Sequence, residues 1–193
     1  MGYAQKRSDR KWTYADYRAW PENERWELID GVAYDMSPAP SREHQKLSRN
    51  LSLQIGGYLQ GKRCEMYAAP FDVRLPDHAG QDDDGIGTVV QPDIVVVCDP
   101  AKLDDRGCKG APDLVIEILS PATAEHDLKD KFHLYQRAGV KEYWIVNQTD
   151  RTVMVFKLTD AGEYGRPDMY ASRDRIPAPL LGELKVDLAE VFA

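Results

Sequence analysis

The sequence predicts an α/β protein of the α+β type, built around a sheet of mixed strand direction. The expected core elements follow the order helix, three strands, helix and two strands, which differs from a repeating strand–helix pattern. Apolar residues recur at every fourth position from Leu47 to Leu59, which predicts one amphipathic helix. Residues 94–97 are all β-branched and apolar, which is typical of a strand buried on both faces.

The first elements follow from local signals. Thr13 can cap a short helix that Pro21 interrupts, and Asp30-Gly31 is the strongest short-range signal for a hairpin. Ser41 is a plausible N-cap for the amphipathic helix, and Gly61 ends it. We therefore expect a helix at residues 13–20, strands at 26–29 and 32–36, and a helix at 41–60.

The later elements alternate with polar, Gly- and Pro-containing segments. Ser120-Pro121 ends the third core strand, and Gly139 closes the following helix as a C-cap. Residues 99–111 contain Pro100 and two glycines and are expected to form a loop. The expected elements are strands at residues 65–75, 88–98 and 113–119, a helix at 124–138, and strands at 142–146 and 151–158.

The 193 residues fit a single domain, with a core at about residues 20–158. The C-terminal tail, residues 159–193, is rich in glycine, proline and charge. We expect short pieces of structure in it, followed by one turn of helix at residues 188–192.

The composition argues against several classes of protein. No apolar stretch is long enough to span a bilayer, and the polar, basic first ten residues do not resemble a signal peptide, so we expect a cytoplasmic protein without a membrane partner. The net charge of −7 argues against a protein that coats nucleic acid, although basic residues do cluster locally. The three cysteines, Cys64, Cys98 and Cys108, are expected to be reduced thiols.

Two predicted strands carry an acid among apolar residues. Asp93 precedes one apolar run, and Glu117 lies between Ile116 and Ile118. These carboxylates come together only if the two strands run antiparallel, which the 14-residue stretch from Cys98 to Ala111 permits. Close carboxylates repel each other unless a cation offsets them, and oxygen ligands select hard ions such as Mg²⁺ or Mn²⁺. Asp93 and Glu117 are therefore candidate metal ligands.

This arrangement resembles the PD-(D/E)XK nuclease superfamily, whose core has the same order of helices and strands. Pro92-Asp93 matches the first half of its motif, and Glu117 matches the acid of the second half. Leu119 stands where the motif has lysine, but some members carry this lysine on the following helix, where this chain has Lys131. The resemblance implies a restriction-endonuclease-like fold preceded by a short N-terminal helix and a hairpin.

The sequence is more closely similar to a large bacterial family of restriction-endonuclease-like proteins long carried as a domain of unknown function. The resemblance spans residues of about 20–158 and is most specific at 112–147. The segment 27–31, the Met36-Ser37-Pro38 step and His44 also match this family.

Each candidate has a simpler structural explanation. Asp93 could bind loop amides, Glu117 could pair with a buried arginine or lysine, and Lys131 could form a surface ion pair with Asp127. Glu27 could be a third acid of the site or an exposed strand residue, and His44 could accept a proton, contact phosphate or be structural. Weaker candidates are Asp72 and Asp113, whereas Tyr135 and Trp144 are expected in the core and His126 and His133 on the surface.

These features predict a Mg²⁺-dependent endonuclease that hydrolyses DNA phosphodiester bonds, with Mn²⁺ as a substitute. Asp93 and Glu117 would bind the metal with the main-chain carbonyl of Ile118, and Lys131 would act on the attacking water. One alternative is a nuclease-fold binding or assembly module with weak or no catalysis, and another is a nuclease for RNA or branched nucleic acid. Because restriction-type nucleases cut both strands, we expect a homodimer.

Overall fold

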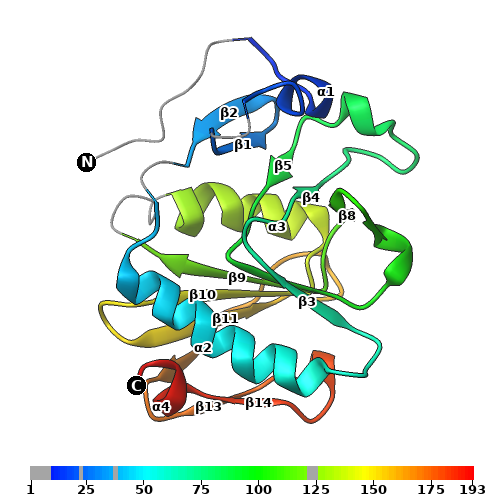
Figure 1. Ribbon diagram of the computed structural model, residues 1–193. Coiled ribbons are helices and arrows are strands. Elements are labelled where there is room, and N and C mark those ends of the chain that lie inside the picture. Colours follow the sequence, from blue (N-terminus) through cyan, green and yellow to red (C-terminus); the bar gives the residue numbers. More distant parts are fainter. Residues whose placement is uncertain (1–9, 22–23, 37–38, 121–125) are drawn as a thin grey trace.

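The described part of the polypeptide forms two six-stranded sheets, a two-stranded ribbon and few helices (Figure 1). The computed structural model describes residues 10–21, 24–36, 39–120 and 126–193. The α-helices are α1 (Tyr14–Tyr17), α2 (Arg42–Leu59), α3 (Phe132–Ala138) and α4 (Leu188–Val191), and the π-helix η3 (His126–Lys131) directly precedes α3. The short 3₁₀ helices are η1 (Asp83–Gly85), η2 (Pro100–Lys102) and η4 (Pro179–Leu181).

The strands divide between the three sheets. The sheet that we call the central sheet has the order β12 (Asp168–Ala171), β11 (Thr152–Lys157), β10 (Glu142–Asn147), β9 (Leu114–Leu119), β6 (Ile94–Val97) and β3 (Glu65–Ala68). The sheet that we call the N-terminal sheet has the order β2 (Val32–Asp35), β1 (Trp26–Ile29), β5 (Val89–Val90), β4 (Val73–Arg74), β8 (Gly107–Lys109) and β7 (Leu103–Asp104). The ribbon pairs β13 (Arg175–Pro177) with β14 (Lys185–Asp187).

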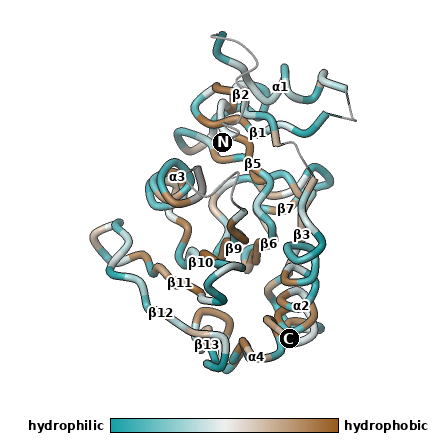
Figure 2. The backbone as a smooth tube through the Cα atoms, turned by 90° about the vertical axis from the view of Figure 1, so that its left-hand side faces the viewer, coloured by the Kyte–Doolittle hydropathy of each residue, from teal (hydrophilic) through white to brown (hydrophobic). Residues whose placement is uncertain are grey.

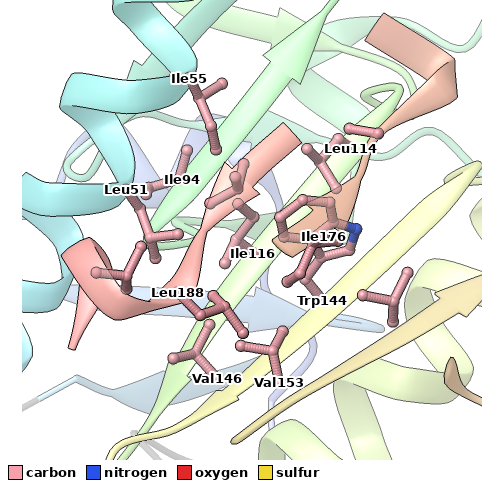
Figure 3. Packing of buried hydrophobic residues seen from close by; sticks show 14 of the residues in the cluster. Leu51, Ile55, Ile94, Leu114, Ile116, Trp144, Val146, Val153, Ile176 and Leu188 are labelled. Carbon is pink, nitrogen blue, oxygen red and sulfur yellow. The ribbon is translucent and has the colours of Figure 1, made fainter. Parts of the chain in front are cut away.

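Helices α2 and α3 cover opposite faces of the central sheet (Figure 1). Ile116 of β9 packs in the cluster that contains Leu51 and Ile55 of α2, as Figure 3 shows. Val115, its neighbour on the same strand, packs instead in the cluster that contains Leu134 of α3. This alternation is the period of two expected for a strand. In Figure 2 the strands β6 and β9 are coloured as hydrophobic, which agrees with burial on both faces.

The mixed strand direction is confirmed, because β9 and β10 run parallel while the other pairs of the central sheet run antiparallel. The predicted hairpin is also confirmed. Asp30 and Gly31 have positive φ angles of 52° and 75°, as a tight two-residue turn between β1 and β2 requires. The first helix is shorter than expected and ends at Tyr17.

Two of the predicted strands are each interrupted in the structure, so the prediction of continuous strands was wrong. Residues 65–75 split into β3 and β4, and residues 88–98 split into β5 and β6, so that each run leaves one sheet and enters the other. Pro70 and Pro92 lie in the two breaks and have no N–H to donate to a ladder. The loop expected at residues 99–111 contains β7 and β8, which are too short for their periodicity to be recognised.

The predicted helix at residues 124–138 is confirmed in part. Its first residues lie outside the described part of the chain, and the described part begins as η3 and continues as α3. Gly139 ends α3 with a φ angle of 87°, and its N–H donates to the carbonyls of Tyr135 and Gln136.

The C-terminal tail forms short elements, as expected, but it also completes the core. Strand β12 extends the central sheet beside β11, and Ile176, Val186 and Leu188 pack in the same cluster as α2. The Gly- and Pro-rich composition of the tail concealed these isolated apolar residues, because they are too widely spaced to form a periodic pattern.

Replacing Leu188 by alanine is expected to lower the free energy of unfolding by about 2–4 kcal/mol, because its side chain is fully buried beneath α2. Urea denaturation monitored by circular dichroism would measure this loss. Met169→Ala, at a position that is 60% exposed in β12, is the matched control and should change stability by less than about 0.5 kcal/mol. Equal small effects of both substitutions would show that the tail is not part of the core.

The cysteine prediction was wrong for two of the three residues. Cys64 and Cys98 form a disulfide between the neighbouring strands β3 and β6, and Cys108 remains a buried thiol. The 34-residue separation concealed the pairing of these two strands in the sequence. In the described ranges, no helix is both long and apolar enough to cross a membrane.

Candidate functional site

Asp93 and Glu117 lie together, as the sequence predicted for antiparallel strands. Ile94 of β6 pairs with Ile116 of β9, so the next residues outward, Asp93 and Glu117, face each other. The Ile118 N–H donates to Asp93 Oδ2 at 2.7 Å, and the Asp93 N–H contacts Glu117 Oε2 at 3.4 Å. The side chain of Glu117 is 5% exposed and that of Asp93 is 18% exposed. Asp93 is therefore the carboxylate of the pair that solvent reaches more readily.

The cationic group of the site is the ammonium of Lys131, the last residue of η3. Its Nζ lies 3.0 Å from Glu117 Oε1 and 3.0 Å from Glu27 Oε1. The side chain of Lys131 is 4% exposed, which excludes the simpler explanation of a solvated surface ion pair. An ammonium group that donates to two buried carboxylates compensates much of their desolvation.

Glu27 belongs to β1, so the site joins the N-terminal sheet to the central sheet. Its side chain is 3% exposed and accepts hydrogen bonds at Oε1 from Lys131 Nζ and from the Gln91 N–H, the latter at 2.8 Å. The alternative of an exposed strand residue is therefore wrong, and Glu27 is the third acid of the cluster.

His44 reaches the site from the first turn of α2. The Ser41 side chain caps this helix and accepts from the His44 N–H. His44 Nε2 lies 3.1 Å from Asp93 Oδ2, and the His44 side chain is 8% exposed. The structure therefore brings together all five of the residues predicted for the site.

Tyr135 is buried in the core, as the sequence predicted, and its hydroxyl also reaches the site. It lies one helical turn after Lys131, and its hydroxyl donates to Glu117 Oε1 at 2.8 Å. Burial, with the nearby Glu117 charge, raises the pKa of Tyr135 well above its ordinary value, so this hydroxyl stays protonated and donates. The spacing of Lys131 and Tyr135 was the available signal, because residues four apart share a helical face.

Of the two weaker candidates, only Asp72 lies near the site. Tyr17 and Gln91, which the sequence did not single out, both donate hydrogen bonds to Asp72 Oδ1. Asp113 shares a face with Glu117 but lies at the other end of β9, where it accepts from the Cys98 N–H and from Lys141. Of the two histidines expected on the surface, His133 is exposed, and the side chain of His126 lies outside the described residues.

The donor set fits a hard divalent cation. Glu27 and Glu117 share the buried Lys131, and a third carboxylate, Asp93, lies beside Glu117, so the acids of the cluster outnumber its lysine. In the described part of the chain, no three His, Cys, Asp or Glu side chains are grouped to hold an ion by themselves. Mg²⁺ commonly takes one or two carboxylates and keeps several waters, so the pair Asp93 and Glu117 suits it.

The comparisons with known proteins agree with this fold. The model of the Uma2 family, described as "Putative restriction endonuclease", matches residues 14–189. The chain therefore belongs to the Uma2 family, and the family resemblance predicted from the sequence is confirmed.

Two individual proteins are also similar to this chain. The "Uncharacterized protein slr1290" of Synechocystis sp. (strain ATCC 27184 / PCC 6803 / Kazusa) is 28% identical over 170 residues, which cover 86% of this chain and 84% of that protein. A solved structure described as "a putative nuclease belonging to DUF820" from Anabaena variabilis ATCC 29413 superposes with a TM-score of 0.72 and 19% identity. It covers 93% of this chain and 97% of the other, and at this identity it shows the shared fold alone.

Proposed function

We propose that this protein is a Mg²⁺-dependent endonuclease that hydrolyses DNA phosphodiester bonds. One observation carries the proposal: Lys131, which follows the acidic strands on a helix, lies 3.0 Å from Glu117 Oε1 inside the cluster that also holds Asp93. Acid, acid and lysine are the three groups that the PD-(D/E)XK resemblance requires. The lysine missing at Leu119 is thus supplied from another element, as the restriction-endonuclease-like arrangement allows.

Asp93 and Glu117 would hold the metal, together with the main-chain carbonyl of Ile118. When bound, the ion would lower the pKa of a water ligand and stabilise negative charge on the phosphate. Lys131, as an ammonium group, would hold the attacking water in position and stabilise the negative charge that develops on the phosphorane. Glu27 and Tyr135 fix the positions of Lys131 and Glu117, because each shares a hydrogen bond with its partner.

The proposed role of His44 is to hold Asp93 in position. Its Nε2 lies 3.1 Å from Asp93 Oδ2, where it restrains the rotation of the carboxylate. It also stands beside Asp93, the more exposed carboxylate of the pair. Asp93, His44 and the first turn of α2 therefore form the side of the site that meets substrate.

Cleavage by the purified protein tests the proposal. Duplex DNA, single-stranded DNA, RNA and a branched DNA junction would be incubated with Mg²⁺, with Mn²⁺ and with a chelator, and the products would be separated on denaturing gels. We expect metal-dependent endonucleolytic cleavage of duplex DNA. Preferred cleavage of RNA or of the junction would move the proposal to that substrate, and absence of cleavage on all four would favour a binding module without catalysis.

The alternative of a binding or assembly module predicts that Lys131 points into solvent, and the burial of this side chain argues against it. We further propose that the protein acts as a homodimer, because cutting both strands of a duplex requires two sites. Sedimentation velocity with and without duplex DNA would measure this, and a monomer under both conditions would contradict it.

A further inference from the structure

Two chain segments bend together between the two sheets. Residues 69–72 connect β3 to β4, and residues 91–93 connect β5 to β6 (Figure 1). The Ala69 N–H donates to the Asp93 main-chain carbonyl at 3.0 Å, so the bends are bonded to each other. Each bend carries an acid, Asp72 on one and Asp93 on the other. The position of Asp93 therefore depends on how these bends are held.

Three polar side chains join the bends to the N-terminal helix. Gln91 Nε2 donates to Asp72 Oδ1 at 2.9 Å and to the Tyr17 hydroxyl at 3.1 Å. The Tyr17 hydroxyl in turn donates to Asp72 Oδ1 at 3.1 Å. We call this closed triangle of hydrogen bonds the Tyr17–Asp72–Gln91 cluster.

The cluster is bonded directly to the candidate catalytic groups. The main-chain N–H of Gln91 donates to Glu27 Oε1 at 2.8 Å, and the same oxygen accepts from Lys131 Nζ at 3.0 Å. Gln91 also lies two residues before Asp93, on the same bend. Gln91 thus orients Glu27 through its main-chain N–H, and its side chain anchors the bend that carries Asp93.

Two polar groups of the cluster, the Asp72 carboxylate and the Gln91 amide oxygen, are buried in unfavourable environments. Burial raises the pKa of Asp72, with a further contribution from Glu27, so its charged form is disfavoured where it stands. The amide oxygen of Gln91 is buried and accepts no hydrogen bond within the described residues. Polar groups that are incompletely satisfied are expected mainly where a site needs them.

We propose that the Tyr17–Asp72–Gln91 cluster positions Glu27 and Asp93, and through Glu27 the ammonium group of Lys131, for the reaction. The inference rests on the proposed nuclease function and adds Gln91, Asp72 and Tyr17 to the site as positioning residues. They act through Glu27 and Asp93 rather than by touching the scissile phosphate.

Steady-state cleavage of duplex DNA by the full chain tests the positioning role. Gln91→Ala is expected to lower kcat by about 10- to 100-fold, as loss of a supporting hydrogen-bond partner does, with KM changed by less than about threefold. Asp72→Ala should behave similarly, whereas Asp72→Asn keeps the accepting oxygen and should retain most of the activity.

Gln54→Ala is the matched control, because Gln54 also makes two side-chain hydrogen bonds, in its case to the main chain of Asp187, away from the site. Its kcat should equal that of the wild type. Equal losses of kcat in Gln91→Ala and Gln54→Ala would overturn the proposal, since general destabilisation would then explain both.

A second measurement reads the position of Lys131 without any cleavage. Acetic anhydride labelling followed by mass spectrometry should find Lys131 protected in the wild type and in Gln54→Ala, and labelled severalfold faster in Gln91→Ala. If the wild type cleaves nothing but Gln91→Ala exposes Lys131, the nuclease proposal fails and the positioning proposal stands. If Gln91→Ala changes neither kcat nor labelling, the positioning proposal is overturned.

Should Gln91→Ala not fold, Tyr17→Phe takes its place, because it removes a single hydroxyl. Tyr58→Phe, which loses the bond from the Glu183 N–H, is its control. A lower kcat and faster labelling of Lys131 in Tyr17→Phe alone would support the proposal, and values equal to the wild type would overturn it.

Discussion

Glu117→Gln is expected to reduce Mg²⁺-dependent cleavage about 10³-fold while the protein stays folded. The amide keeps the volume of the carboxylate but loses the charge that a divalent cation requires. Lys131 retains Glu27 as a partner, so the buried ammonium is not left without a counter-ion. Gel-based cleavage rates, with thermal melting to confirm folding, would measure both effects.

The control for this variant is Asp113→Asn on the same face of the same strand run. Burial raises the pKa of Asp113, but the hydrogen bonds from Lys141 and the Cys98 N–H outweigh it and hold the pKa below its ordinary value. Its carboxylate therefore contributes stability at neutral pH that is lost as the pH falls through the folded-state pKa. Asp113→Asn should lose about 1 kcal/mol of stability at pH 7 and keep full cleavage activity. Equal cleavage by Glu117→Gln and Asp113→Asn would contradict the assignment of Glu117.

Lys131→Met is expected to have the second largest effect, with a loss of cleavage of about 10²- to 10³-fold. This variant should also lose about 3–5 kcal/mol of unfolding free energy, because Glu27 and Glu117 are then buried without their shared cation. Methionine fills a similar space, so the loss reports charge rather than a cavity. Urea denaturation and cleavage rates would be measured on the same preparation.

The double variant Glu27→Gln/Lys131→Met separates structure from catalysis. Removing one of the two carboxylates should restore much of the lost stability, because Glu117 alone is then left without the cation that Lys131 supplied. Cleavage should remain absent, because no ammonium group is present. If cleavage returns with stability, Lys131 is a structural counter-ion and not a catalytic group.

The sequence predicted which residues form the site better than it predicted the long-range contacts that hold them in place. The period of two in β9 put Glu117 on one face, and the antiparallel pairing with β6 then fixed Asp93 opposite it. Lys131 could be selected over Lys129 only by resemblance, and the structure buries Lys131 and leaves Lys129 exposed. Glu117 and Lys131 could be found because they lie on regular elements, and Asp93 because it directly precedes one.

Other parts depended on contacts that one sequence does not reveal. Tyr17, Asp72 and Gln91 come from three separate segments, and they meet only because two strand runs change sheets near Pro70 and Pro92. The pairing of β3 with β6, which brings Cys64 to Cys98, and the burial of the tail are likewise long-range. Local periodicity has no access to such contacts.

The most direct test of the central claim is a crystal of the protein soaked in MnCl₂ and measured at the manganese absorption edge. We predict one anomalous peak between Asp93 and Glu117, about 2.0–2.3 Å from an oxygen of each carboxylate, with Lys131 still beside Glu117. A map without this peak at saturating manganese, in which Asp93 and Glu117 keep their hydrogen bonds to Ile118 and Tyr135, would contradict the account.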